Sequence, residues 1–216
     1  MACFQPWPGL ADAVALKEKL TDQPPFPWGT LVVALGAGLA LVFPAVSERL
    51  IYDRSLIFQG QVWRGWSGHV VHYGLSHFFW NLAVFLPAGC WLERLWPRGT
   101  RWFYVVGPLV ISVALLLLDP ALDRYAGLSG LATGMLVLLA GLQLRRGKNE
   151  PAWFWLGVLA LVGAKITLEL ITGAPLIVSG FAGIRTVPLA HISGVACGIL
   201  FWGIARSSLL RSGSWR

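Results

Sequence analysis

The sequence predicts an all-α integral membrane protein, a six-transmembrane-helix bundle whose N- and C-termini both lie in the cytoplasm. Three observations predict it: a composition poor in charge, six apolar stretches, and basic residues concentrated in alternate joining segments. The six stretches form one membrane domain, residues 28–205, between a cytoplasmic N-terminal segment, 1–27, and a cytoplasmic C-terminal tail, 206–216. We therefore expect a multi-pass protein of the cell membrane.

Composition separates this chain from soluble proteins. Of its 216 residues 56% are hydrophobic and 12% are charged, and the mean hydropathy is +0.65. Soluble domains carry about 25% charged residues, so a soluble enzyme, a disordered tail and a nucleic-acid reader are all poor interpretations. The net charge of +7 does not predict a nucleic-acid partner, because the basic residues are scattered along the chain. The three cysteines show no ligand spacing, which gives no reason to expect a metal site.

A spanning helix needs about 20 mostly apolar residues. The first predicted span, 28–46, follows a proline-rich segment, and the second begins at Gly74 within the stretch 65–92. The third, 102–118, is short but strongly apolar, and the fourth covers 125–144. The fifth, 152–171, is interrupted by Lys165 and Glu169. The sixth covers 186–205, and the short connections predict a single bundle.

Basic residues in short flanking segments set the orientation of a membrane protein. With the N-terminus inside, eleven of the 17 basic residues fall in cytoplasmic segments, five fall outside, and Lys165 lies within a span. This asymmetry predicts that the second, fourth and sixth spans all enter the membrane from its outer side.

Polar groups inside spans are costly and are functional candidates by default. His77 and Asn81 are four residues apart, so on the second span they share one helix face. Ser129 opens the fourth span in the run Gly-Leu-Ser-Gly, and His191 lies near the start of the sixth. All four residues are therefore expected at one depth below the outer surface, whereas the Lys165–Glu169 pair is expected to lie deeper.

Small residues provide a second geometric argument. Ala126, Gly130 and Gly134 form a stripe at spacing four, and a matching stripe on the sixth span is formed by Ala190, Gly194 and Gly198. Such stripes let membrane helices approach closely. If the two stripes face each other, the Ser129 hydroxyl comes within reach of the His191 imidazole, which is the nucleophile–base pair of a serine hydrolase.

Each of these signals also has an ordinary structural explanation. A serine in an apolar helix is often bonded back to its own helix, and His77, Asn81 and His191 are able to serve as interhelical hydrogen-bonders. His69 and His72 are expected near the membrane surface. Lys165 and Glu169 are most simply a self-neutralising ion pair.

Taken together in this order, the motifs resemble the rhomboid intramembrane serine proteases between about residues 63 and 202. The matching pieces are Trp63-Arg64, the run from His77 to Asn81, the run from Gly127 to Gly130, and Ala190-His191 followed by Gly194 and Gly198. The resemblance implies a rhomboid-like fold with Ser129 as nucleophile and His191 as general base, without a carboxylate.

The same resemblance implies an oxyanion hole formed by His77, Asn81 and the backbone at Leu128 and Ser129. Gly127 and Gly130 would let backbone and substrate approach closely. Thr133 stands where many rhomboids carry an aromatic that stacks on the catalytic histidine, and its hydroxyl is a candidate hydrogen-bond partner for His191. No metal or organic cofactor is implied.

The compact size and the polar fifth span also look like the rhombosortase branch, which processes C-terminal Gly-Gly-type sorting tails of bacterial surface proteins. We therefore expect membrane lipids and transmembrane protein substrates, including Gly-Gly-tailed ones, as partners, in a bacterial inner membrane with the active site facing outward. Two alternatives stay open: a catalytically silent rhomboid-like protein that binds membrane clients, and a small transporter using His77, His191, Lys165 and Glu169 as a polar pathway.

Overall fold

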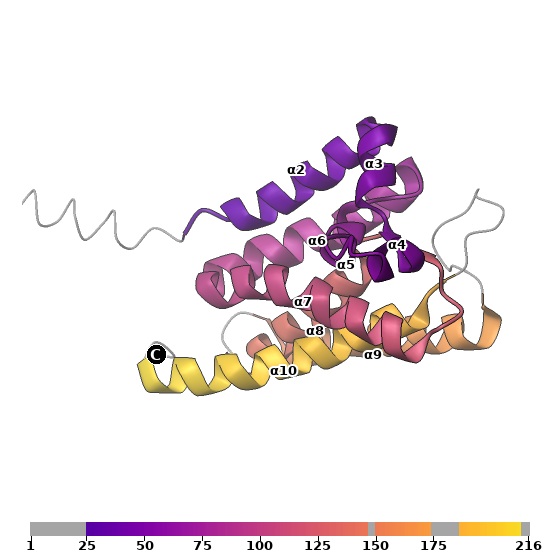
Figure 1. The fold of residues 1–216 in the computed structure, drawn as a ribbon. Helices are drawn as coiled ribbons and strands as arrows, with labels where there is room; N and C mark the ends of the chain where they lie inside the picture. Colours follow the sequence, from indigo (N-terminus) through magenta and orange to yellow (C-terminus); the bar gives the residue numbers. More distant parts are fainter. Residues whose placement is uncertain (1–24, 147–149, 174–185, 213–216) are drawn as a thin grey trace, which may run out of the picture.

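The computed structural model describes residues 25–146, 150–173 and 186–212. Within them the chain is a helical bundle (Figure 1) whose long helices are α2 (Trp28–Val42), α6 (Leu75–Leu95), α7 (Pro97–Leu118), α8 (Ser129–Arg146), α9 (Ala152–Thr172) and α10 (Pro188–Ser212). Nearly all of the predicted N-terminal segment 1–27 lies outside the described residues. The first part of the predicted tail is helical, because α10 continues to Ser212.

Four described helices are long and apolar enough to cross a membrane: α6, α7, α9 and most of α10. A fifth span results if α2 and α3 (Pro44–Leu50) are counted together, although they meet at an angle of 117°. The bend comes where Pro44 begins α3, since Phe43 before it takes an extended conformation and a residue preceding proline is disfavoured in a helix. The predicted span 28–46 is therefore not one continuous helix.

Helix α8 lies in the middle of the bundle, in contact with α6, α7, α9 and α10 (Figure 1). Twelve of its 18 residues are buried, and it is not among the described helices apolar enough to be recognised as spans. Both facts have one cause: a helix surrounded by other helices does not need a continuous lipid-facing apolar surface. Small and polar residues fit there because they allow close packing.

The fourth predicted span begins too early. Arg124 and Tyr125 form a short strand, β2 (Arg124–Tyr125), paired antiparallel with β1 (Tyr52–Asp53), and α8 begins only at Ser129. Ala126 therefore precedes the helix and is not part of its small-residue stripe. The strand and the turn that follows it bring Ser129 to the first position of α8.

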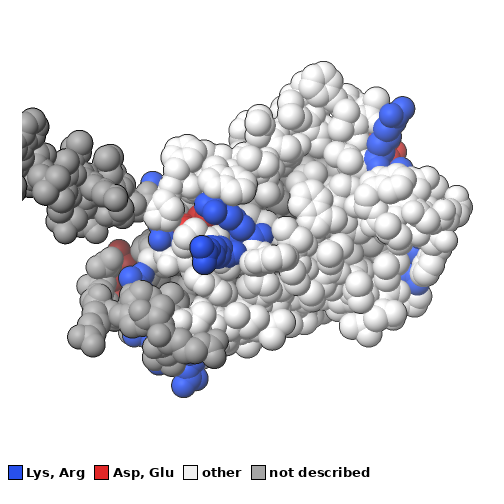
Figure 2. All heavy atoms as spheres, turned by 60° about the vertical axis from the view of Figure 1, so that its left-hand side comes forward, with Lys and Arg blue, Asp and Glu red and all other residues white. Residues whose placement is uncertain are grey.

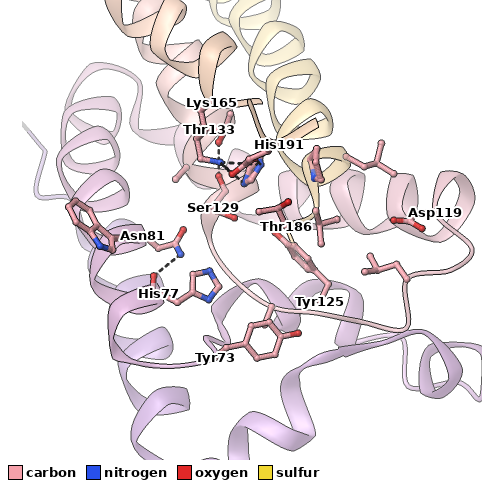
Figure 3. Close-up of a pocket in the computed structure, with 18 of the residues that line it drawn as sticks. Tyr73, His77, Asn81, Asp119, Tyr125, Ser129, Thr133, Lys165, Thr186 and His191 are labelled. Carbon is pink, nitrogen blue, oxygen red and sulfur yellow. Dashed lines mark hydrogen bonds and ion pairs between the residues drawn. The ribbon is translucent and has the colours of Figure 1, made fainter. Parts of the chain in front are cut away.

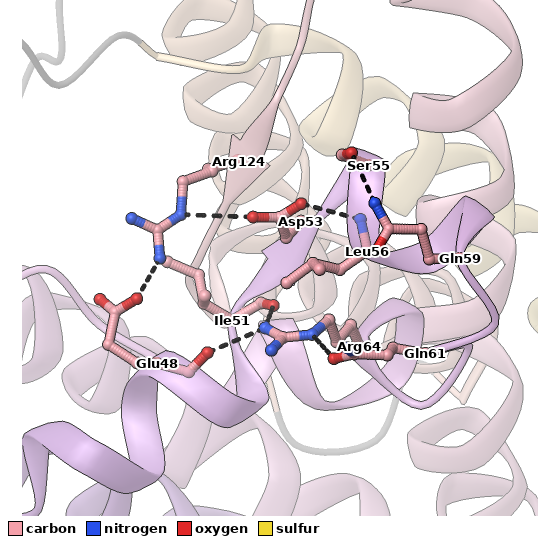
Figure 4. Close-up of polar contacts among 9 residues, drawn as sticks. All are labelled: Glu48, Ile51, Asp53, Ser55, Leu56, Gln59, Gln61, Arg64 and Arg124. Carbon is pink, nitrogen blue, oxygen red and sulfur yellow. Dashed lines mark hydrogen bonds and ion pairs between the residues drawn. The ribbon is translucent and has the colours of Figure 1, made fainter.

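The segment between α3 and α6 folds as three short helices, α4 (Arg54–Phe58), α5 (Arg64–Ser67) and η1 (Gly68–Val70). Arg64, 6% exposed, organises this segment (Figure 4): its guanidinium donates to the carbonyls of Glu48 and Ile51, both at 2.9 Å, and to the Gln61 side chain. Arg124 of β2 pairs with the Glu48 carboxylate beside it. The segment that precedes α6 is thereby fixed against β2, four residues before Ser129.

Charge is distributed as in a protein surrounded by lipid. On the face drawn in Figure 2, Lys and Arg side chains gather toward two opposite ends, with a broad uncharged surface between them. Many large hydrophobic side chains are exposed along the helices, among them Leu117, Leu161 and Ile171. An exposed apolar surface of this extent is expected where hydrocarbon, and not water, is the solvent.

Candidate active site

One pocket of about 730 Å³ collects the polar residues singled out in the sequence (Figure 3). It is lined from α6, α8, α9 and α10 and from the segment 119–126 that carries β2. His77, Asn81, Ser129, Thr133 and His191 all line it. Its volume falls in the range of ligand-binding clefts and leaves room for a short stretch of peptide.

Ser129 and His191 are brought together by the contact between α8 and α10. A side-chain carbon on Gly130 would lie 2.8 Å from the Ala190 carbonyl oxygen, and one on Gly194 would clash with the Gly130 carbonyl oxygen. The two backbones thus touch next to Ser129 and next to His191. The helical parts of the two small-residue stripes face each other, since Gly198 packs on Gly134 in the same way.

The Ser129 side chain shares no hydrogen bond with His191 within the described part of the chain. It lies instead beside the Tyr125 hydroxyl, and this hydroxyl donates to the Gly127 carbonyl at 3.0 Å. Burial raises the pKa of Tyr125, so its phenol is neutral at ordinary pH. Because nucleophile–base hydrogen bonds are often long before substrate binds, this geometry is compatible with a serine nucleophile.

Gly127 adopts a conformation that other residues avoid, with φ at +127°. A β-carbon at this position would also lie 2.8 Å from the His77 imidazole. Glycine is therefore required at this position for two reasons, its backbone conformation and the close approach of His77. The result places the His77 ring directly against the turn that leads into Ser129.

The predicted oxyanion residues gather on this side of the pocket. His77 and Asn81 lie one helical turn apart on α6, and the Asn81 amide donates to the His77 carbonyl at 2.8 Å. His77 Nδ1 is buried and has no hydrogen-bond partner among the described residues. Ser129 is the first residue of α8, and backbone amides in the first turn of a helix have no acceptor within the helix. Leu128 has a fully buried side chain and is not among the residues that line the pocket.

Thr133 does not contact His191 in the way the sequence suggested. Its hydroxyl donates to the Ser129 carbonyl at 2.8 Å, because a threonine in a helix readily bonds the carbonyl four residues earlier. His191 is contacted from α9 instead: Glu169 Oε2 lies 2.7 Å from His191 Nδ1, and Lys165 Nζ lies 3.2 Å from each ring nitrogen.

The expectation that Lys165 and Glu169 lie deeper than the other polar residues is wrong for Glu169. Helix α9 runs in the opposite direction to α10, so its last turn meets the first turn of α10, where His191 lies. The predicted ion pair is present, with Lys165 Nζ at 2.7 Å from Glu169 Oε1. Its contact with His191 was not predicted, although the alternating direction of the spans already placed residue 169 near the outer end.

His69 and His72 do not line the pocket and are not at a surface. They are 1% and 5% exposed, and the His69 ring lies 3.1 Å from the Ser112 hydroxyl. Burial lowers the pKa of His69 to about 4 and that of His72 to about 3. Both histidines are therefore neutral, buried parts of the fold, and their expected place near the membrane surface stays a prediction.

The comparison with protein families identifies the fold. The model of the Rhomboid domain matches residues 59–208, which is well over half of the chain. The chain belongs to the rhomboid family. No curated protein matches it closely enough to count as a relative.

Membership of the rhomboid family makes this chain a multi-pass membrane protein of a family of intramembrane proteases. The match covers α5 to α9, most of α10 and the whole pocket, and it begins within the segment organised by Arg64. Rhomboid proteins also include inactive members. The activity of this rhomboid therefore has to be argued from its own pocket.

Proposed function

We propose that this rhomboid protein is an intramembrane serine endopeptidase in which Ser129 is the nucleophile and His191 the general base. The observation that carries the proposal is the backbone contact of α8 with α10, which puts these two residues side by side at one end of a pocket of peptide size (Figure 3). The alternative of a silent client-binding protein is weaker, because such a protein has no need of both residues.

The proposed reaction uses residues already present in the pocket. Ser129 Oγ attacks the carbonyl carbon of a client peptide bond while its proton passes to His191 Nε2. The carbonyl oxygen becomes an oxyanion beside His77, the Asn81 amide and the Ser129 backbone amide, and donors preorganised in this way contribute several kcal/mol. The C–N bond then breaks as His191 returns the proton to the leaving nitrogen, and water hydrolyses the acyl-enzyme.

The proposal includes six spans, with α8 as the fourth and the α2–α3 pair as the first. Both termini are placed in the cytoplasm and the pocket near the outer face, because the basic residues concentrate in the segments assigned to the inside. In this orientation the clients are membrane-anchored proteins cleaved in or beside a transmembrane segment. The polar pair on α9 and the compact size support a Gly-Gly-type sorting tail as one client class, in a bacterial inner membrane.

The test is labelling with a fluorophosphonate probe, which acylates activated serines. We expect Ser129→Ala to abolish labelling and to lower cleavage of a transmembrane substrate by at least about 10³-fold, and His191→Ala to have a similar effect. Ser193→Ala is the matched control, because Ser193 lies on α10 two residues from His191 and its hydroxyl is bonded to the Leu189 carbonyl. Labelling that persists in Ser129→Ala would contradict the assignment.

The same reagent tests orientation and client class. A membrane-impermeant version should label Ser129 from outside in spheroplasts, and labelling only from the inside would reverse the topology. Cleavage should be measured with a transmembrane substrate and with a Gly-Gly-tailed one. Failure with both, in a protein that also resists labelling, would favour the silent client-binding protein.

A further inference from the structure

A carboxylate lies against the proposed catalytic histidine. Glu169 Oε2 is 2.7 Å from His191 Nδ1, and the two residues are 3% and 5% exposed. Within the described residues Oε2 forms no hydrogen bond, and its ion-pair contact is with His191 Nδ1. The Nδ1 atom is therefore the group available to satisfy this buried oxygen, which would otherwise carry a substantial desolvation cost.

We infer that Glu169 is a positioning residue for His191, so that the site works as a Ser129–His191–Glu169 triad; this inference rests on the proposed function. A hydrogen bond from Nδ1–H to Oε2 selects the tautomer in which Nε2 is unprotonated. That nitrogen is then free to accept the Ser129 proton. The carboxylate also stabilises the imidazolium formed when the proton arrives and stays ionised throughout.

Lys165 neutralises the charge of Glu169. Its ammonium bonds the other carboxylate oxygen, Oε1, at 2.7 Å, and its side chain, 29% exposed, is less deeply buried than that of Glu169. A lone carboxylate inside a membrane protein would be strongly disfavoured, and pairing offsets much of that cost. The ion pair leaves Oε2 for His191.

The remaining neighbours of His191 do not replace Glu169. Besides Lys165 and Glu169 from α9, His77 from α6 interacts electrostatically with His191. The other titratable side chains that line the same pocket are those of Tyr73, Asp119, Asp123, Arg124 and Tyr125. Helix α8 contributes the Ser129 hydroxyl and Thr133, whose hydroxyl is bonded to the Ser129 carbonyl. Lys165 alone, 3.2 Å from both ring nitrogens, would oppose the charging of the imidazole. Glu169 is the group that favours it.

The first test compares two buried glutamates. Glu169→Gln removes the charge but keeps the shape, and we expect kcat to fall by about 10²- to 10⁴-fold with little change in KM. Glu93→Gln is the matched control, since Glu93 is fully buried and paired with Arg101 but belongs to a separate cluster. It should keep the wild-type rate per folded molecule. Glu169→Asp should recover part of the lost rate.

The pH–rate profile separates a positioning role from a merely structural one. Without the Glu169 charge, and with Lys165 still present, the imidazolium is less favourable, so the acid limb of kcat/KM should move to lower pH in Glu169→Gln. Loss of packing alone would lower the amount of folded enzyme without moving this limb.

A double variant covers the case in which Glu169→Gln does not fold. Lys165→Met with Glu169→Leu removes both charges and leaves an apolar surface, a replacement that buried ion pairs often tolerate. A folded double variant with the slow rate supports the triad. Cleavage at the wild-type rate by the double variant or by Glu169→Gln would overturn the triad. Continued labelling of Ser129 in these variants would still support the proposed protease function. Absence of labelling in the wild type would overturn both.

Discussion

Two buried glutamates at different places in the bundle have opposite surroundings. Glu93 on α6 is fully buried and accepts hydrogen bonds from the Gly29 and Thr30 amides, the Thr30 hydroxyl and Arg101. Among the described residues, Glu169 on α9 has Lys165 on one oxygen and only His191 beside the other. Glu93 lies apart from the pocket, whereas Glu169 lines it.

The comparison shows how the surroundings of a carboxylate indicate its role. The Glu93 carboxylate closes the first turn of α2, whose amides have no acceptor in their own helix, and it ties α2 to α6 and to Arg101 on α7. All its hydrogen-bonding capacity is used within the fold. Glu169 keeps one oxygen for an imidazole that faces a pocket, so its charge remains able to influence chemistry there.

The largest expected effect on stability is at Glu93. Glu93→Gln should lower the free energy of unfolding by about 3 kcal/mol, because the new amide donors face donors already present at Gly29, Thr30 and Arg101. Thermal unfolding in detergent measures this change, with Glu169→Gln as the counterpart. Equal loss of stability in both variants, with equal loss of rate, would remove the distinction between the two clusters.

The contact of α8 with α10 should affect both stability and activity. Gly194→Ala puts a methyl group against the Gly130 carbonyl, where backbone atoms have no rotamer by which to move away. We expect a loss of about 2 kcal/mol and a slower reaction, since Ser129 and His191 move apart. Gly203→Ala on the same helix is the control, because a β-carbon there has open space around it. Similar behaviour of the two variants would contradict the close packing.

Acid should destabilise the segment before α6 through its two buried histidines. Their folded-state pKa values, about 4 for His69 and about 3 for His72, lie below the ordinary value of about 6.5. The unfolded chain therefore binds protons first, and stability present above pH 6.5 is lost as the pH falls below it. Each histidine should cost about 1.4 kcal/mol at pH 5.5.

The measurement is the free energy of unfolding at pH 7.5 and pH 5.5. His69→Gln should show a loss between these two values that is about 1.4 kcal/mol smaller than in the wild type, because one of the two buried histidines is gone. His77 and His191 are present in both proteins and do not affect the difference. An unchanged loss would mean that His69 is already charged in the folded state.

Much of the bundle follows from local properties of the chain. The second, third, fifth and sixth spans were predicted to within a few residues, apart from the start of α7 and the end of α10, because long apolar stretches have to form helices in a membrane. The bend at Pro44 and the start of α8 were missed. The first depends on a single proline, and the second depends on β2 pairing with β1 some 70 residues earlier in the chain.

The residues of the candidate site likewise include some that were predictable from the sequence and one that was not. Ser129, His191, His77 and Asn81 were all recognisable, since polar residues stand out against apolar spans and the matched glycines align the helices that carry them. The residue that contacts His191 was not recognisable. Thr133 was the predicted partner, but the hydroxyl of a threonine within a helix readily bonds a backbone carbonyl of the same helix.

The sequence alone determined that this chain is a membrane protein and which residues are able to do chemistry, because both follow from composition and from the order of motifs along the chain. Its low content of charge, 12% of the residues, leaves every buried ionisable group conspicuous. Only the tertiary structure decided which of those groups meet. The contact between Glu169 and His191 depends on α9 and α10 packing side by side in opposite directions, and that arrangement is a property of the bundle and not of either helix.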